Sequence, residues 1–259
     1  MAEVLHLSLR LVLLLSSLTL SMTGDPFPDI TDQDFIHSCV SAHNHARSNV
    51  IPPASFMRYM TWDNGLAVLA KTWGTNCLFQ HNSVRDHPGF ASVGENLWAG
   101  APPSVFSVTS AINNWVNEDK DYTYYTRTCK AGKMCGHYTQ VVWATTYKVG
   151  CAVISCPNGV KQTSFSQTPG AIFVCNYATA GNYPNVYPYE QGESCSKCGG
   201  EVCENNLCKN YTRDGDAELR VCGVFCKSVL IIRPVSLVFI FISVYVAQRR
   251  CPNIFAYIN

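Results

Sequence analysis

The sequence predicts an extracellular α+β domain, and three observations support that prediction. Apolar residues recur at helical spacing through the first half of the chain, and β-branched residues form two short runs after residue 148. The chain holds 14 cysteines, which follow an N-terminal segment with the form of a secretory signal. Cysteines at this density in a secreted chain are typical of disulfide bonds. We therefore expect an α+β fold stapled by disulfides.

Length and charge limit the possible functions. The chain has 259 residues, enough for one sizeable domain with attachments or for two small domains. Its net charge is +1, charged residues make up 14%, and no acidic or basic block stands out. Neither nucleic-acid binding nor a polyanionic substrate is therefore indicated.

The first 24 residues have the features of a signal peptide. Leucine dominates Leu5 to Leu20, in which Arg10 is the only charge, and small residues follow between Ser21 and Gly24. We expect cleavage near Ser21–Gly24. Because few positive charges precede the apolar run, an uncleaved anchor is the alternative.

Three helices are expected before the strands. The first begins at Thr31, an N-cap with Asp34 three residues later, and ends near Asn49 because two prolines follow. The second is capped by Asp63 or Asn64 and carries an apolar stripe that ends at Cys77. The third is opened by Pro102, Pro103 and Ser104 and ends near Glu118.

Two runs rich in β-branched residues predict a hairpin. They are Val149–Cys156 and Ala171–Cys175, and a turn around Pro157–Gly159 separates them. Cys151 and Cys175 could pair across this hairpin. The Pro- and Tyr-rich segment from Tyr183 to Tyr189 is expected to be a linker or a wrapping segment.

The stretch GHYTQVVWATT, Gly136 to Thr146, is the first candidate for a site. On a helix, His137 and Gln140 share a face, and a polar pair on an apolar element can form the wall of a cleft. The alternative is a satisfied histidine in the core or at its rim. Glu95 lies between Gly94 and a Leu-Trp pair, flanks that suggest burial and therefore a partner.

Other groups of residues are weaker candidates or belong to other kinds of site. His43 and His45 suggest a metal site, but residues two apart on a helix point to different faces. Glu118, taken alone, is typical of a solvated helical carboxylate.

The four cysteines at positions 195, 198, 203 and 208 can form a zinc site or two disulfides, and the secretory context without histidine favours disulfides. Asn210-Tyr211-Thr212 is an N-glycosylation acceptor.

A second apolar run lies near the C-terminus. Ser228 to Ala247 is apolar apart from Arg233, and a span of about 20 such residues can cross a bilayer core. Arg249 and Arg250 follow, so we expect a single-pass type I helix at 228–247 after a linker at 211–227, with a cytoplasmic tail at 248–259. A glycolipid anchor is the alternative, and Cys251 is a palmitoylation candidate.

Several of these motifs resemble the CAP superfamily of cysteine-rich secretory, antigen 5 and pathogenesis-related proteins. GHYTQVVWATT resembles its first motif, and IFVCNYATAGNY from Ile172 to Tyr183 resembles its second, with a departure at Thr179. GENLW, the helix end at Glu118 and His81 also match, so the resemblance covers about Ile30 to Cys208. The cysteine-rich hinge and the apolar ending resemble the glioma pathogenesis-related branch. No ion-channel-regulating six-cysteine domain follows Cys208, so channel blocking is not implied.

The resemblance implies a three-layer α-β-α sandwich with a central cleft at residues 30–190, followed by a disulfide-rich hinge at 191–210. In the family a tetrad lines the cleft, and two histidines can hold a divalent ion, often zinc, bound weakly and not needed for folding. The tetrad maps onto His81, Glu95, Glu118 and His137, with His81 and His137 as metal ligands and the carboxylates orienting the rings or holding water.

The resemblance also implies disulfide pairs. These are Cys77–Cys156, Cys151–Cys175, Cys129–Cys135, Cys195–Cys203 and Cys198–Cys208. Cys39 is then left over as a buried thiol, and Cys222 and Cys226 could pair with each other.

Three functions stay open. The first and favoured one is a membrane-tethered extracellular binding module for a protein or for a lipid or sterol, as the resemblance to CAP proteins implies. It would reside in the secretory pathway and at the cell or vesicle membrane, and a secreted or glycolipid-anchored form is the alternative. The second is a metal-dependent hydrolase with Glu95 or Glu118 as general base, although two protein ligands are fewer than a catalytic zinc usually has. In the third, the tetrad is purely structural.

Overall fold

A four-stranded sheet forms the centre of the computed structural model, which describes residues 26–215, 245 and 249–250. The strand order is β2-β6-β7-β3. The two long strands, β6 (Lys148–Cys156) and β7 (Gly170–Ala178), pair as an antiparallel hairpin over their whole length. The edge strand β3 (Gly94–Gly100) runs antiparallel to β7, and the short β2 (Thr61–Trp62) runs parallel to β6. The predicted hairpin is therefore present and lies at the middle of the sheet.

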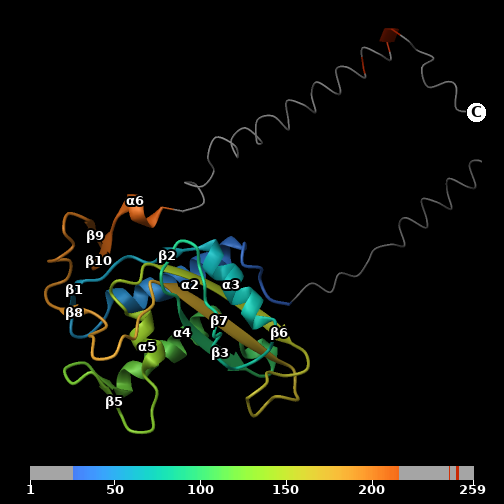
Figure 1. The fold of residues 1–259 in the computed structure, drawn as a ribbon, viewed down its shortest axis with the longest axis horizontal. Coiled ribbons are helices and arrows are strands. Elements are labelled where there is room, and N and C mark those ends of the chain that lie inside the picture. The colour runs from blue at the N-terminus through green and yellow to red at the C-terminus, as the bar shows by residue number, and fades with distance from the viewer. Residues whose placement is uncertain (1–25, 216–244, 246–248, 251–259) are drawn as a thin grey trace, which may run out of the picture. The chain divides into compact units, whose positions relative to one another are not determined.

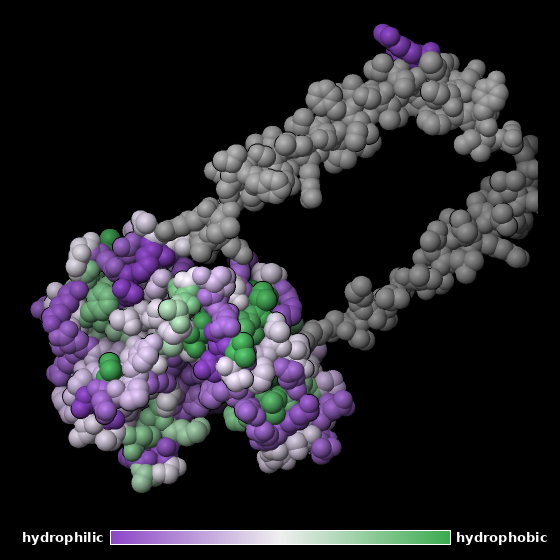
Figure 2. Space-filling view, in the orientation of Figure 1, coloured by the Kyte–Doolittle hydropathy of each residue, from purple (hydrophilic) through white to green (hydrophobic). Residues whose placement is uncertain are grey.

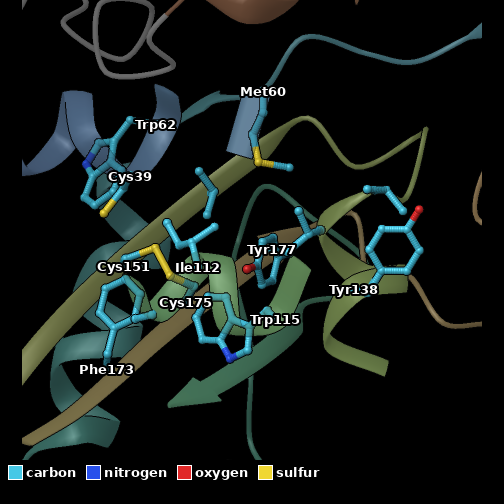
Figure 3. Packing of buried hydrophobic residues seen from close by; sticks show 14 of the residues in the cluster. Cys39, Met60, Trp62, Ile112, Trp115, Tyr138, Cys151, Phe173, Cys175 and Tyr177 are labelled. Carbon is cyan, nitrogen blue, oxygen red and sulfur yellow. A yellow bond between two sulfur atoms is a disulfide. The ribbon is translucent and has the colours of Figure 1, made fainter. Parts of the chain in front are cut away.

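Side-chain alternation along the hairpin divides the core in two. Successive residues of a strand point to opposite faces. One face carries seven buried residues of the larger cluster: Val149, Cys151, Val153, Ala171, Phe173, Cys175 and Tyr177. The other carries Ala152, Cys156, Ile172 and Val174, which pack with Leu97 and Ala70. Figure 3 shows the first face, with the Cys151–Cys175 disulfide between Phe173 and Tyr177.

Helices cover both faces, which makes a three-layer α-β-α arrangement (Figure 1). One face packs against α2 (Gln33–Ser48), α4 (Val108–Val116) and α5 (Gly136–Val141). The other packs against α3 (Asn64–Gly74). Contact between α3 and β6 is so close that a Cβ at Gly150 would lie 2.1 Å from the backbone nitrogen of Ala67.

Two of the predicted helix starts are wrong. Asp32 caps α2 by accepting a 2.8 Å hydrogen bond from the Phe35 backbone, whereas the Thr31 hydroxyl donates to Asp29. The prolines do not open the third helix: they start a separate 3₁₀ turn, η1 (Pro103–Val105), and Ser107 caps α4. In the predicted second helix, Asp63 caps α3 as expected.

Glu118 lies beyond α4, in the 3₁₀ turn η2 (Asn117–Asp121). A small ribbon follows, made of β4 (Tyr122–Thr123) and β5 (Thr128–Cys129). The predicted end of the third helix near Glu118 is therefore replaced by a tighter turn, which moves this carboxylate off the helix surface.

Five disulfides join these elements, and they are the five pairs that the family resemblance implies. Cys77–Cys156 links the segment after α3 to β6, Cys151–Cys175 joins β6 to β7, and Cys129–Cys135 closes the loop before α5. Cys195–Cys203 and Cys198–Cys208 staple the hinge. Cys39 on α2 is a free thiol, and burial raises its pKa.

The hinge is docked onto the main domain. It contains the hairpin β9 (Val202–Glu204) and β10 (Leu207–Lys209), and the preceding β8 (Glu190–Gln191) pairs with β1 (Ala54–Phe56). The backbone of Cys208 donates to Met57 and accepts from Tyr59. The described residues up to Lys209 form one unit, and those from Asn210 on belong to another.

The segment from Tyr183 to Tyr189 wraps around the domain, one of the two arrangements expected. The backbone nitrogen of Ala144 donates to the carbonyl of Pro188 at 2.7 Å, and the Tyr124 hydroxyl donates to the carbonyl of Tyr189 at 2.8 Å. In the second unit, the described residues include the one-turn helix α6 (Tyr211–Asp214), capped by the Asn210 side chain.

Several predicted segments lie outside the described residues. They are the signal peptide at 1–24, the linker from residue 216 on, Cys222, Cys226 and Cys251, and the apolar span and tail apart from Tyr245, Arg249 and Arg250. Within the part of the chain that is described, no helix has the length and apolar character needed to cross a membrane.

Candidate functional site

Glu118 and His137 form the more buried half of the candidate site. The N-cap residue of α5, Cys135, provides no side-chain cap. Glu118 supplies it instead, because its Oε2 accepts from the backbone nitrogens of His137 at 3.0 Å and Tyr138 at 3.2 Å. Its Oε1 accepts from Nδ1 of His137 at 2.6 Å. One carboxylate thus starts the helix and orients the imidazole that the helix carries.

An aromatic ring supports this imidazole from one side. The Trp115 ring stacks on that of His137, with centroids 6.2 Å apart and planes 13° from parallel. The indole nitrogen of Trp115 donates to the carbonyl of Leu97 at 3.0 Å, which ties α4 to β3. The His137 ring is therefore held by its carboxylate and by its packing, and 16% of its side chain stays exposed.

His81 and Glu95 form the other half. Glu95 lies on β3 with a fully buried side chain, and its Oε1 accepts from Nδ1 of His81 at 2.8 Å and from the Asn82 backbone at 3.0 Å. The Arg85 guanidinium lies 3.9 Å from the same oxygen. The partners expected for a buried carboxylate are present. The His81 side chain is 58% exposed, so this half opens to solvent.

Strand β3 connects the two halves. Glu95 and Asn96 are consecutive residues of a strand, so their side chains point to opposite faces of the sheet. Glu95 binds His81 on one face, while Nδ2 of Asn96 donates to the backbone carbonyl of His137 at 3.0 Å. The edge strand is thus the common support of both His–Glu pairs.

The free nitrogens of the two rings can act as ligands. Both Nδ1 atoms face carboxylates, which leaves each Nε2 as the lone-pair nitrogen of a neutral ring. No described residue forms a hydrogen bond with Nε2 of His81 or His137. Metal-ligating histidines commonly have such a carboxylate on the other ring nitrogen. One oxygen of Glu95, Oε2, is also buried with no hydrogen-bond partner among the described residues.

The donor set is small. Among the described residues, no cluster of three or more His, Cys, Asp or Glu side chains is arranged to hold a metal ion. A catalytic zinc usually has three protein ligands and an open position. Two imidazoles with water completing the shell would bind a divalent ion more weakly than such a site.

Other candidates from the sequence lie elsewhere. Gln140 is buried, and its side chain accepts from the backbone of Gly181 at 2.9 Å, so it fixes the loop after β7. His43 is buried on α2 with both ring nitrogens bonded, to the Cys39 carbonyl and the Tyr177 hydroxyl, and burial lowers its pKa to about 4. His45 is exposed on another face of the helix. The two histidines do not share a metal site.

Three residues of the site were not predicted from the sequence. Asn96 follows Glu95 in the GENLW motif, and no sequence pattern singles out Trp115 or Arg85. The sequence does hold one indication for Asn96. It is a polar residue beside Glu95 on an otherwise apolar strand, so, like Glu95, it needs a hydrogen-bond partner when buried.

A concave surface lies apart from the two His–Glu pairs, near the wrapping segment. It is a groove of about 820 Å³ lined mainly by aromatic and apolar residues. Its aromatic lining residues are Phe56, Tyr124, Tyr125, Trp143, Tyr183, Tyr187 and Tyr189. In the view of Figure 2, by contrast, hydrophobic residues form small patches among hydrophilic ones, so that face has no broad apolar surface.

Solved structures share this architecture. One of them, "Crystal Structure of Na-ASP-1", is 27% identical, with a TM-score of 0.56 over 72% of this chain and 52% of that chain. Another, "Crystal structure of NaASP2 with Zn2+", is 25% identical, with a TM-score of 0.54 over 72% of this chain and all of that chain.

Sequence comparisons identify the family to which the chain belongs. GLIPR1-like protein 1 of Bos taurus is 50% identical over 192 residues, 72% of this chain and 76% of that protein. Glioma pathogenesis-related protein 1 of Mus musculus is 50% identical over 198 residues, 75% of this chain and 72% of that protein. Residues 40–177 match the family model described as "Cysteine-rich secretory protein family". With its sandwich and its His–Glu pairs, the chain belongs to this CAP family, in the glioma pathogenesis-related branch.

Proposed function

We propose that this protein is an extracellular CAP-domain binding module in which His81 and His137, held on the two sides of the edge strand β3, offer their free ring nitrogens to a divalent cation such as zinc. The observation that carries the proposal is the same in both pairs: a carboxylate occupies Nδ1, and Nε2 is left without a partner among the described residues. Such a carboxylate fixes the tautomer and increases the basicity of a ligating imidazole. The Zn2+ in the NaASP2 crystal structure supports the choice of cation.

The small donor set favours binding over hydrolysis. With two protein ligands the cation is weakly held, and both carboxylates already accept hydrogen bonds from an imidazole and from backbone nitrogens. Metal uptake would adjust the cleft for a partner while the five disulfides hold the fold without it. The apolar run at 228–247 would tether the module to the membrane, and Asn210 would carry a glycan.

Isothermal titration of zinc into the purified full chain tests the metal site. We expect His81→Ala and His137→Ala each to weaken binding by about tenfold or more. His37→Ala is the matched control, because His37 is an exposed histidine of α2 outside the site, and it should leave the isotherm unchanged. Affinity should fall as pH drops, because only neutral imidazole binds zinc. Identical isotherms for wild type and both site variants would refute the metal site and leave the tetrad structural.

The aromatic groove favours a second candidate, binding of a lipid or sterol. Small-molecule sites are typically concave and mostly apolar, with volumes of about 300–1,000 Å³, and this groove falls in that range. Tyr125 is 68% exposed there, so a ligand could cover its ring. A hydroxyl-bearing apolar ligand would contact the rings and reach the polar side chains at Asn185 and Gln191.

Capture of a radiolabelled sterol by the full chain tests this candidate. Tyr125→Ser should reduce retention, because it removes an exposed ring from the groove. Val84→Ser is the control, because Val84 is 63% exposed and does not line the groove. Retention that both variants lower equally would place sterol binding outside the groove.

A further inference from the structure

We propose that Tyr177 and Asn96 are positioning residues for His137, the last links of a buried hydrogen-bond relay that starts on α2. The relay runs from the Cys39 carbonyl through His43, Tyr177 and Asn96 to the backbone carbonyl of His137. The effect of the relay on metal affinity rests on the proposed function, whereas its effect on the position of the His137 ring does not.

The direction of every bond follows from the groups involved. A carbonyl only accepts, so Nδ1 of His43 carries the hydrogen and donates to Cys39 at 2.7 Å. Nε2 of the neutral ring must then accept, and the Tyr177 hydroxyl donates to it at 2.8 Å. The hydroxyl oxygen remains an acceptor, and Nδ2 of Asn96 donates to it at 3.3 Å. The second hydrogen of the same amide goes to His137 at 3.0 Å.

Burial makes this order obligatory. His43 and Tyr177 are fully buried and Asn96 is 1% exposed. A buried polar group that loses its partner costs about 1–3 kcal/mol, because no water replaces the partner. Burial also keeps the His43 ring neutral and raises the pKa of the Tyr177 hydroxyl, so both groups hold the protonation states that the relay requires.

The relay completes the fixation of His137. Glu118 holds its backbone nitrogen and its ring, and Asn96 holds its backbone carbonyl. The α5 helix is only six residues long, so its own hydrogen bonds fix its first turn poorly. Tyr177 sets the place of Asn96, and Asn96 in turn sets the position from which the imidazole reaches into the site.

Tyr177→Phe tests the relay, because it removes one hydroxyl and keeps the ring. Long-range ¹H–¹⁵N correlation spectra of the full chain report the ring nitrogens of each histidine. We expect the His137 ring signals to shift and the His81 signals to stay in place, because His81 is held by Glu95 on the other face. Zinc affinity should fall by about tenfold, as for other lost supports of metal ligands.

Tyr124→Phe is the control, because it also removes a hydroxyl that donates to a backbone carbonyl, but outside the relay. A purely structural role would lower the stability in both variants without moving the His137 signals. The relay is refuted if Tyr177→Phe shifts these signals no more than Tyr124→Phe does. If Tyr177→Phe does not fold, Asn96→Asp takes its place, because it removes both donated hydrogens. The relay then predicts that the His137 ring signals shift more in Asn96→Asp than in Tyr124→Phe. If wild type binds no zinc, the proposed function fails while the spectra still decide the relay.

Discussion

Glu118 holds His137 by two different groups at once, its ring nitrogen at 2.6 Å and its backbone nitrogen at 3.0 Å. The residues are 19 apart in the sequence and lie on different elements. The carboxylate therefore does the work of an N-cap for α5 from outside the helix. Helix formation and orientation of the imidazole depend on one side chain.

Glu118→Ala should lower the free energy of unfolding by about 1–2 kcal/mol, the usual effect of removing an N-cap. It should also weaken zinc binding, because the ring loses its orienting partner. Urea unfolding of the full chain measures the first effect. Asp119→Ala, at the exposed neighbouring position, is the control and should change stability by less than about 0.5 kcal/mol. Equal stability of the two variants would contradict the capping role.

Gly150→Ala should destabilise the protein by about 3 kcal/mol, because backbone atoms of α3 occupy the space of the new methyl group. The nearest is the Ala67 nitrogen at 2.1 Å, and backbone cannot move aside as a side chain can. Thermal unfolding or secreted yield measures the effect. Gly136→Ala is the control, since its new methyl would meet nothing closer than the Asn182 side chain at 3.8 Å. Wild-type stability of Gly150→Ala would show that α3 packs differently.

Removal of the Cys77–Cys156 disulfide should cost more than removal of Cys129–Cys135. The first closes a loop with a sequence separation of 79 and the second one of 6. The chain-entropy relation gives about 4.5 kcal/mol and about 2.4 kcal/mol respectively. Double alanine variants of each pair, compared by denaturant unfolding, test this order. The reverse order would mean that strain or residual structure outweighs loop entropy.

His43 should make the protein less stable in mild acid. Its pKa is about 4 in the fold, because burial disfavours the charged ring, against 6.5 in the unfolded chain. Below pH 6.5 the His43 ring is protonated in the unfolded chain but stays neutral in the folded protein. The free energy of unfolding therefore falls as pH drops to about 4 and then levels off. The full loss is of the order of 3 kcal/mol. The free energy of unfolding should differ less between about pH 7 and about pH 4.5 in His43→Gln than in wild type. If the difference between the two pH values is the same in both proteins, His43 is not its source.

The local parts of the fold could be predicted from the sequence. The β6–β7 hairpin and the Asp63 cap follow from β-branched runs and from a capping residue beside an apolar stripe. Thr31 and Asp32 are neighbours, and both residue types are good N-caps. What decides between them is that the Thr31 hydroxyl donates to Asp29, in the segment before the helix. Pro102 and Pro103 fit the first turn of a helix equally well whether that helix continues or breaks after one turn.

The site itself depended on tertiary contacts. Nothing near Glu118 in the sequence indicates that it reaches α5, since its partners come 19 and 20 residues later. The tetrad could be assigned by family resemblance because that assignment needs residue types only. The roles of Asn96 and Tyr177 require knowledge of which faces of β3 and β7 meet α2 and α5, and strand patterns do not supply that.

The edge strand sets the register of the whole site. Glu95 and Asn96 serve the two imidazoles only because β3 aligns residue for residue with β7, from Gly94 opposite Tyr177 to Gly100 opposite Ala171. A one-residue slip would exchange the faces of both side chains and disconnect both histidines together. Insertions in the loop before β3 should therefore be tolerated for as long as the alignment survives, whereas a single residue inserted within the strand would abolish the site.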